Sequence, residues 1–117
     1  MKKLIVTAGI AIENNHVLIA KRKNGKSLSG FWEFPGGKLE DNESPKQCIE
    51  RELKEELNVD AIASNDIFCR VSHRYEDFEI DLIAFEVKLS SHPKSSIDHD
   101  DLIWVKIDDL MNYKLTP

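Results

Sequence analysis

Three glutamates, Glu52, Glu55 and Glu56, occupy positions i, i+3 and i+4 of one charged segment. If this segment is helical, their carboxylates share a stripe one turn long. Two like charges ~4 Å apart repel by roughly 1 kcal/mol in bulk water and by roughly 4 kcal/mol at the effective dielectric near a protein surface. Three converging carboxylates therefore favour a nearby counter-charge, and Mg²⁺ is a hard cation that prefers oxygen ligands of this kind.

Two interpretations of this stripe are open. Lys46, Arg51 and Lys54 could neutralise it, in which case the stripe is only a solvated, salt-bridged helix face. The glycine pair Gly36–Gly37 lies just upstream, and glycines let the backbone approach an ion or a phosphate closely. The glutamates alone do not decide between the two, but the glycine pair favours a cation site.

The segment 44–57 has the start signals of a helix that would carry these glutamates. Ser44 is a good N-cap, Pro45 suits the first helical position, and Gln47 completes a capping box. The apolar residues that recur with helical spacing are Ile49, Leu53 and Leu57. We therefore expect one helix with an apolar side toward the core and the glutamates beside it.

The rest of the chain reads mainly as strands and connecting loops. We expect a hairpin of residues 3–12 and 16–22 across an Asn14-Asn15 turn, a loop at 23–30, strands at 66–75 and 78–88 joined near Glu76-Asp77, a loop at 90–101, a strand at 102–107 and a helical turn at 108–113. Because strands and helices interleave without a regular βαβ period, the pattern predicts an α+β fold with helices packed on a mixed sheet.

Size and composition narrow the class of protein. A chain of 117 residues, 41% of them apolar, fits a single domain spanning residues 1–117. The net charge of −5 argues against a nucleic-acid binder, and no stretch approaches the ~20 apolar residues of a membrane span. Cys48 and Cys69 have no metal-ligand spacing, and one pair is not a disulfide framework, so a cytoplasmic location is expected. The four histidines likewise lack metal-ligand spacing, so we expect them to be solvated or hydrogen-bonded.

The segment 37–59 resembles the signature of the Nudix family, which is G, five residues, E, seven residues and REUxEExGU, where U is aliphatic. The matching residues are Gly37, Glu43, Arg51, Glu52, Leu53, Glu55, Glu56 and Val59. One position departs, because Asn58 stands where the family has glycine. Asparagine is the non-glycine residue that best tolerates the left-handed conformation, so we expect the turn to survive at a small cost in stability.

The resemblance covers nearly the whole chain. Residues 30–38, GFWEFPGGK, are similar to the stretch before the signature in the MutT-like branch, which includes pyrophosphohydrolases of oxidised dGTP and of CTP. It implies a Nudix fold, with a mixed β-sheet sandwiched between α-helices, and a Mg²⁺ cofactor that Mn²⁺ could replace. Relatives commonly continue into a final helix, so this chain is expected to lack that helix or to be shortened.

The resemblance also implies roles for residues of the signature. The ligands implied for the metal ions are the Gly36 carbonyl and the carboxylates of Glu52, Glu55 and Glu56. Glu52 is the implied general base, Arg51 would orient it, and Glu43 would pair with Arg51 rather than bind metal. A further ligand in this branch stands six residues before a tryptophan, which is Asp98 counted back from Trp104; Asp98 could equally be an ordinary loop acid.

Substrate contacts are less specific. Lys38, together with Lys21 or Arg22, could bind phosphates, although charged strand ends are usually just solvated. Phe34 matches a position that lines the nucleobase site in the branch, and Phe78 could lie near it; each could instead be part of the core.

The implied reaction is Mg²⁺-assisted hydrolysis of a nucleoside triphosphate, of the 8-oxo-dGTP or (d)CTP type, to a nucleoside monophosphate and pyrophosphate. Two alternatives are a Nudix hydrolase of a dinucleoside polyphosphate or a nucleotide sugar, and a module that senses a nucleotide without catalysis. The expected partner is a small-molecule nucleotide, with no nucleic acid or membrane, and the expected state is a monomer or homodimer.

Overall fold

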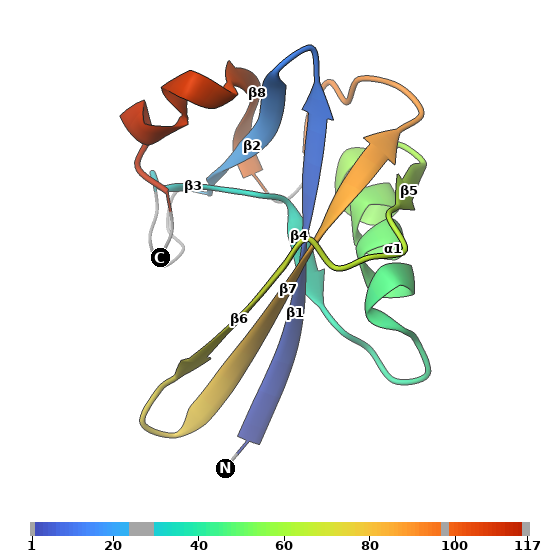
Figure 1. The fold of residues 1–117 in the computed structure, drawn as a ribbon, viewed down its shortest axis with the longest axis vertical. Helices are drawn as coiled ribbons and strands as arrows, with labels where there is room; N and C mark the ends of the chain where they lie inside the picture. Colours follow the sequence, from blue (N-terminus) through green and yellow to red (C-terminus); the bar gives the residue numbers. More distant parts are fainter. Residues whose placement is uncertain (1, 24–29, 97–98, 116–117) are drawn as a thin grey trace.

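The computed structural model describes residues 2–23, 30–96 and 99–115. Their elements are β1 (Lys2–Glu13), β2 (His16–Arg22), β3 (Trp32–Glu33), β4 (Gly36–Lys38), α1 (Pro45–Leu57), β5 (Ala61–Ala63), β6 (Cys69–Arg74), β7 (Phe78–Leu89), β8 (His99–Lys106) and the 3-10 helix η1 (Ile107–Asn112). The described strands form one mixed sheet, because β1 pairs antiparallel with β2 and β4 and parallel with β7 (Figure 1). The predicted mixed sheet is confirmed.

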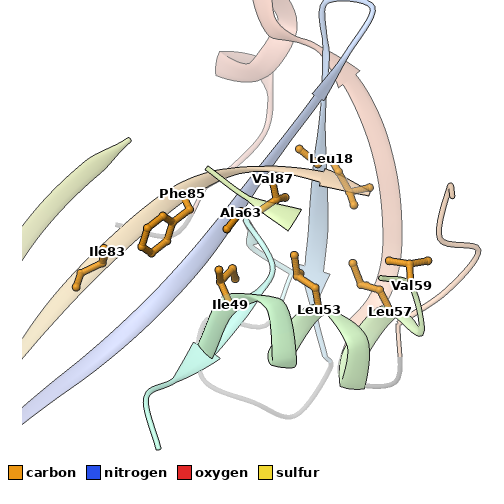
Figure 2. Packing of buried hydrophobic residues seen from close by; sticks show 10 residues of the cluster. Leu18, Ile49, Leu53, Leu57, Val59, Ala63, Ile83, Phe85 and Val87 are labelled. Atoms are coloured by element: carbon orange, nitrogen blue, oxygen red, sulfur yellow. The ribbon is translucent and has the colours of Figure 1, made fainter. Parts of the chain in front are cut away.

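The helix α1 is bounded as its sequence predicts. The Ser44 side chain accepts a hydrogen bond from Gln47 N, and the Gln47 side chain accepts one from Ser44 N, which is the expected capping box. At the other end, Asn58 adopts the left-handed conformation, with φ 56° and ψ 37°. Ile49, Leu53 and Leu57 are buried against the sheet (Figure 2). Packing on this face fixes which side of α1 carries the glutamates.

The opposite face of the sheet is covered differently. A second buried cluster there consists of Ala8, Ile10, Val17, Ile19, Ala84 and Val105. Leu110 and Tyr113, from η1 and the residue that follows it, pack against this cluster. Figure 1 shows α1 and η1 on opposite sides of β1. Within the ranges that the structure describes, one α-helix and one 3-10 helix therefore flank the sheet.

Some of the expected boundaries agree with the structure, and others differ. The β1–β2 hairpin turns at Asn14 and Asn15, with φ 49° and 64°, as expected. The strand expected from residue 66 begins only at Cys69, because Ser64 makes a side-chain turn with the backbone of Asp66. β3, β4 and β5 were not predicted, since strands of two or three residues are too short to show alternation.

The C-terminal elements are shifted by a few residues. β8 starts at His99, three residues before the predicted strand at 102–107, and the loop expected at 90–101 is correspondingly shorter. The helical turn expected at 108–113 is η1. Most of the loop expected at 23–30 lies outside the described residues.

Candidate active site

The glycine pair lies directly against the sheet and the helix. Gly36 and Gly37 belong to β4, which pairs with β1 at Ala8 and Thr7. A Cβ on Gly36 would lie 1.9 Å from the Thr7 carbonyl oxygen, and a Cβ on Gly37 would lie 2.2 Å from Glu52 Oε2. Strand pairing therefore requires glycine at position 36, whereas glycine at position 37 leaves room for the Glu52 carboxylate in its observed position.

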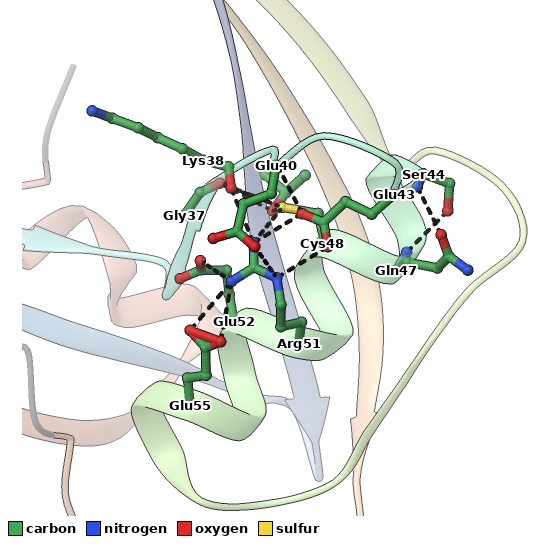
Figure 3. Close-up of polar contacts among 11 residues, drawn as sticks. Gly37, Lys38, Glu40, Glu43, Ser44, Gln47, Cys48, Arg51, Glu52 and Glu55 are labelled. Atoms are coloured by element: carbon green, nitrogen blue, oxygen red, sulfur yellow. Dashed lines mark hydrogen bonds and ion pairs between the residues drawn. The ribbon is translucent and has the colours of Figure 1, made fainter.

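Arg51 joins the acidic residues around this glycine pair, which is called the glycine bend below. Its Nε and Nη2 donate to the two carboxylate oxygens of Glu43 at 3.0 and 2.8 Å. Its Nη1 donates to Glu52 Oε1 at 2.7 Å and to Glu55 Oε1 at 3.2 Å (Figure 3). Nη2 also donates to the Lys38 carbonyl at 3.1 Å. The contacts expected between Arg51 and both Glu43 and Glu52 are thus present, and the guanidinium ties α1 to the β4 loop.

Two of the glutamates that Arg51 contacts, Glu52 and Glu43, differ in the direction of their pKa shifts. Burial raises the pKa of the Glu52 carboxyl, the charges of Glu55 and Glu40 raise it further, and Arg51 only partly opposes them. Hydrogen bonds from Arg51 lower the pKa of Glu43 to about 2. Glu43 is therefore the permanent anionic partner of Arg51, whereas Glu52 keeps the higher proton affinity that a general base needs.

The site holds more negative charge than Arg51 neutralises. The side chain of Glu52 is 16% exposed, Glu56 is buried at 7%, and Glu55 is 56% exposed. Burial is the main cause of the raised pKa of Glu52, and the charges of Glu55 and Glu40 add to it. Carboxylates beside a glycine bend are an all-oxygen donor set, which fits a hard divalent cation. Among the described residues, however, no group of three or more acidic, histidine or cysteine side chains is gathered closely enough to hold a metal.

Two buried side chains, Thr7 and Cys48, contact the backbone carbonyl groups of β4. Thr7 Oγ1 donates to the Gly37 carbonyl at 3.3 Å and lies 3.2 Å from Cys48 Sγ, which in turn lies 3.4 Å from the Lys38 carbonyl. Thr7 and Cys48 are almost completely buried. These contacts fix the carbonyl groups that follow Gly36.

The predicted phosphate contacts point in different directions. Lys38 is exposed at the end of β4. Lys21 Nζ lies 5.9 Å from the centre of the Trp32 ring, whereas Arg22 Nη1 donates to Glu33 Oε1 at 2.8 Å. Successive side chains of a strand point to opposite faces, so these two cations do not share a face of β2. Each remains a prediction as a phosphate ligand.

The remaining predicted residues are spread over the molecule. Phe34 packs against the second core cluster. Phe78 stacks on Tyr75 at 4.8 Å and pairs with Lys2, whereas Gly37 pairs with Thr7. At ~3.3 Å per residue of β1, Phe78 and the glycine bend are roughly 17 Å apart along the strand. Asp98 lies outside the described residues.

Glu33 and His99 are not among the site residues that the sequence predicts. The structure buries His99 at 8% exposure, with Nε2 2.9 Å from Glu33 Oε2. The position of His99 directly after Asp98 was the one sign in the sequence that it could belong to the site. The sequence does not show that Glu33 is its partner.

Comparisons with known proteins establish the family. Residues 7–117 match the family model described as NUDIX domain. An 8-oxo-dGTP diphosphatase of Proteus vulgaris is 45% identical over 87 residues, which are 74% of this chain and 77% of that protein. A CTP pyrophosphohydrolase of Escherichia coli K12 is 33% identical over 119 residues, covering 100% of this chain and 86% of that protein.

The fold agrees with these sequence matches. The solution structure of the E. coli ORF135 protein superposes with a TM-score of 0.83 at 29% identity, covering 100% of this chain and 83% of that one. The crystal structure of a MutT protein from Methanosarcina mazei has a TM-score of 0.84 at 24% identity and supports the fold alone. The chain belongs to the Nudix hydrolase family, whose members generally use a divalent metal ion. No helix among the described residues is long and apolar enough to cross a bilayer.

Proposed function

We propose that this protein is a Mg²⁺-dependent pyrophosphohydrolase that cleaves a nucleoside triphosphate of the 8-oxo-dGTP or (d)CTP type. The observation that carries the proposal is the Glu52 carboxylate, which rests on Gly37 and is held by Arg51. Relatives named 8-oxo-dGTP diphosphatase and CTP pyrophosphohydrolase support the substrate class.

The proposed chemistry assigns roles to three residues of the signature. Glu52 accepts a proton from the attacking water, and its raised pKa suits this role. Arg51 holds the Glu52 carboxylate in place, while Glu43 holds Arg51. The water oxygen bonds to the β-phosphorus, and the bond from that phosphorus to the bridging oxygen breaks. The products are a nucleoside monophosphate, which keeps the bridging oxygen, and pyrophosphate.

The proposed metal ligands are the Gly36 carbonyl and the carboxylates of Glu52, Glu55 and Glu56, with Asp98 as a further candidate. When bound there, Mg²⁺ would neutralise the triphosphate and lower the pKa of the attacking water. Manganese is the expected substitute. The protein side chains contribute positioning and the proton acceptor.

A panel assay tests this function. Purified protein with Mg²⁺ is given 8-oxo-dGTP, dGTP, CTP, dCTP, a dinucleoside polyphosphate and a nucleotide sugar, and pyrophosphate, phosphate and monophosphate are measured. We expect pyrophosphate release from 8-oxo-dGTP or a cytidine triphosphate. Preferential cleavage of the dinucleoside polyphosphate or the nucleotide sugar would move the protein to another Nudix activity, and absence of all turnover would favour a sensing module.

The Glu52→Gln variant tests the proton acceptor. Its turnover should fall by at least ~100-fold while nucleotide binding persists, because loss of a general base typically costs 10²–10⁴ in rate. Glu50→Gln is the matched control, since Glu50 lies on the same helix but accepts a hydrogen bond from Ala63 N, away from the bend. Near-normal turnover in Glu52→Gln would remove Glu52 from this role.

A further inference from the structure

A β-bulge directs His99 into the protein. Along the β2–β8 ladder, Lys21 pairs with Asp101, but Arg22 then pairs with His99, so Asp100 is the extra residue. Bulges re-aim side chains and are frequent next to active sites. The bulge accounts for a buried histidine at the start of a strand whose next two residues are exposed acids.

The His99 ring is held from both sides. Its Nε2 lies 2.9 Å from Glu33 Oε2, and its Nδ1 lies 2.8 Å from Ser96 Oγ. Burial acts to raise the pKa of Glu33, but hydrogen bonds from His99 and Arg22 outweigh it and leave that pKa below 4.5. Glu33 is therefore an ionised acceptor, and Nε2–H of His99 donates to it.

Glu33, on β3, also contacts a third strand, β2. Its other oxygen, Oε1, accepts from Arg22 Nη1 at 2.8 Å. One carboxylate thus binds β8 through His99 and β2 through Arg22. A guanidinium carries its five N–H donors in a rigid fork, so a contact at one nitrogen sets the direction of the whole group.

Arg22 and Lys21 point to opposite faces of β2, and only Arg22 belongs to this network. Leu18 shares a face of β2 with Arg22, and Leu18 packs in the same core cluster as Leu53 and Leu57 of α1. Arg22 consequently lies on the α1 side of the sheet. Lys21 points to the other side, toward Trp32, which packs on the second cluster.

We propose that His99 is a positioning residue of the substrate site, which acts through Glu33 to fix the guanidinium of Arg22 for contact with the nucleotide polyphosphate. This role rests on the proposed function for its substrate. It also selects Arg22 over Lys21 as the polyphosphate-binding cation of β2.

The test compares His99→Phe with His99→Gln in the full chain. Phenylalanine fills the space without a hydrogen bond, whereas glutamine retains an N–H donor near the position of Nε2. For His99→Phe we expect the KM for 8-oxo-dGTP to rise about 10-fold. The Kd for inorganic tripolyphosphate, measured by calorimetry, should rise by the same factor. This is the lower end of the range for side chains that orient metal ligands from behind, which we take as the nearest comparison. The kcat should stay within about threefold, the Mn²⁺ Kd should not change, and His99→Gln should recover most of the binding.

A double-mutant cycle shows whether the effect passes through Arg22. Arg22→Ala should weaken tripolyphosphate binding at least as much, and adding His99→Phe should change it by less than about twofold more. Lys21→Ala should bind normally. His92→Gln is the matched control, because His92 makes an exposed contact with Glu13 at 3.0 Å.

Three results would overturn the positioning role: an unchanged tripolyphosphate Kd in His99→Phe, a full additional effect in the Arg22→Ala background, or an equal loss of Mn²⁺ affinity. If His99→Phe does not fold, Glu33→Gln carries the same test, since its amide offers only one acceptor oxygen to the two donors. Wild-type protein that binds tripolyphosphate through these residues but releases no pyrophosphate from any nucleotide would contradict the proposed function alone.

Discussion

Gly37 links the backbone of the sheet to the proposed proton acceptor. In Gly37→Ala the new Cβ would meet only the end of a flexible side chain, 2.2 Å from Glu52 Oε2, so the carboxylate must move while the backbone stays. Because a misplacement of about 1 Å can cost ~100-fold in rate, we expect kcat to fall by about that factor. The free energy of unfolding in urea should change by less than about 1 kcal/mol.

Gly36→Ala is the contrasting control for this prediction. Its Cβ would lie 1.9 Å from the Thr7 carbonyl oxygen, which is backbone and cannot swing aside. This variant should lose stability as well as activity. Equal turnover in Gly37→Ala and wild type would show that the observed position of the Glu52 carboxylate is not needed for catalysis.

At this scale, sequence predicts residues that share one helix far better than residues that meet across strands. The capping box between Ser44 and Gln47 was expected from their spacing and is observed, whereas the contacts of Arg51 with Glu43 and Glu52 were expected only from the resemblance to the Nudix signature. Glu33 and His99 meet only after β2, β3 and β8 have paired with a bulge. No local pattern contains that register.

The helix α1 owes its precise end to Asn58. Asn58 has φ 56° and donates its backbone N–H to the Lys54 carbonyl at 3.0 Å. Asn58→Gly should raise the free energy of unfolding by a few tenths to about 1 kcal/mol, because glycine adopts this conformation without steric cost. Urea denaturation would measure the change, with the same m value used for both proteins.

Asn58→Ala should have the opposite effect on stability. Alanine has the same steric cost in the left-handed region without the local polar compensation of asparagine, so it should destabilise the protein. If glycine proved no better than asparagine, the family's preference for glycine at this position would need a reason other than conformation.

Element length decided which parts of the fold were predictable. β1, β2, β7 and α1 are long enough to show alternation or a helical stripe, and their predicted ranges agree with the structure to within a few residues. β3 and β4 are stretches of two and three residues that exist because β2 and β1 offer them hydrogen-bonding edges. Such strands are a product of tertiary pairing rather than of local sequence.

The whole molecule is organised around β1. It pairs with β7 from Lys2 to Ala11 and with β4 at Val6–Ala8, and its last residues turn into β2, which pairs with β3 and β8. The Gly36–Gly37 pair lies on β4, which pairs with β1 beside α1, whereas Arg22, Glu33 and His99 belong to β2, β3 and β8 (Figure 1). The proposed metal ligands of α1 and the Arg22–Glu33–His99 network therefore come from different elements. We therefore expect mutations of the proposed catalytic residues and of the proposed polyphosphate-binding residues to have separate effects.

Asp81 provides a test of how the β6–β7–β1 end of the sheet is held together. Its side chain is 2% exposed, accepts a hydrogen bond from Ser72, and pairs with Arg70 Nη2 at 3.0 Å and Lys3 Nζ at 3.2 Å. The hydrogen bonds from Ser72 and Arg70 lower the pKa of Asp81 from 3.8 to about 2. Because the folded state prefers the ionised form, the stabilisation is fully present above the unfolded pKa of 3.8 and is lost as the pH falls through about 2.

Asp81→Asn should therefore destabilise the protein most near neutral pH, and its difference from wild type should shrink as the pH falls from about 5 to about 2. Urea unfolding of both proteins across this range measures that difference directly, so that acids common to both cancel. Asp66→Asn, in an exposed turn, is the matched control and should follow the wild type at every pH. A difference between Asp81→Asn and wild type that stayed constant down to the lowest pH would mean that Asp81 contributes through packing and neutral hydrogen bonds, and that its charge does not hold β6 and β1 to β7.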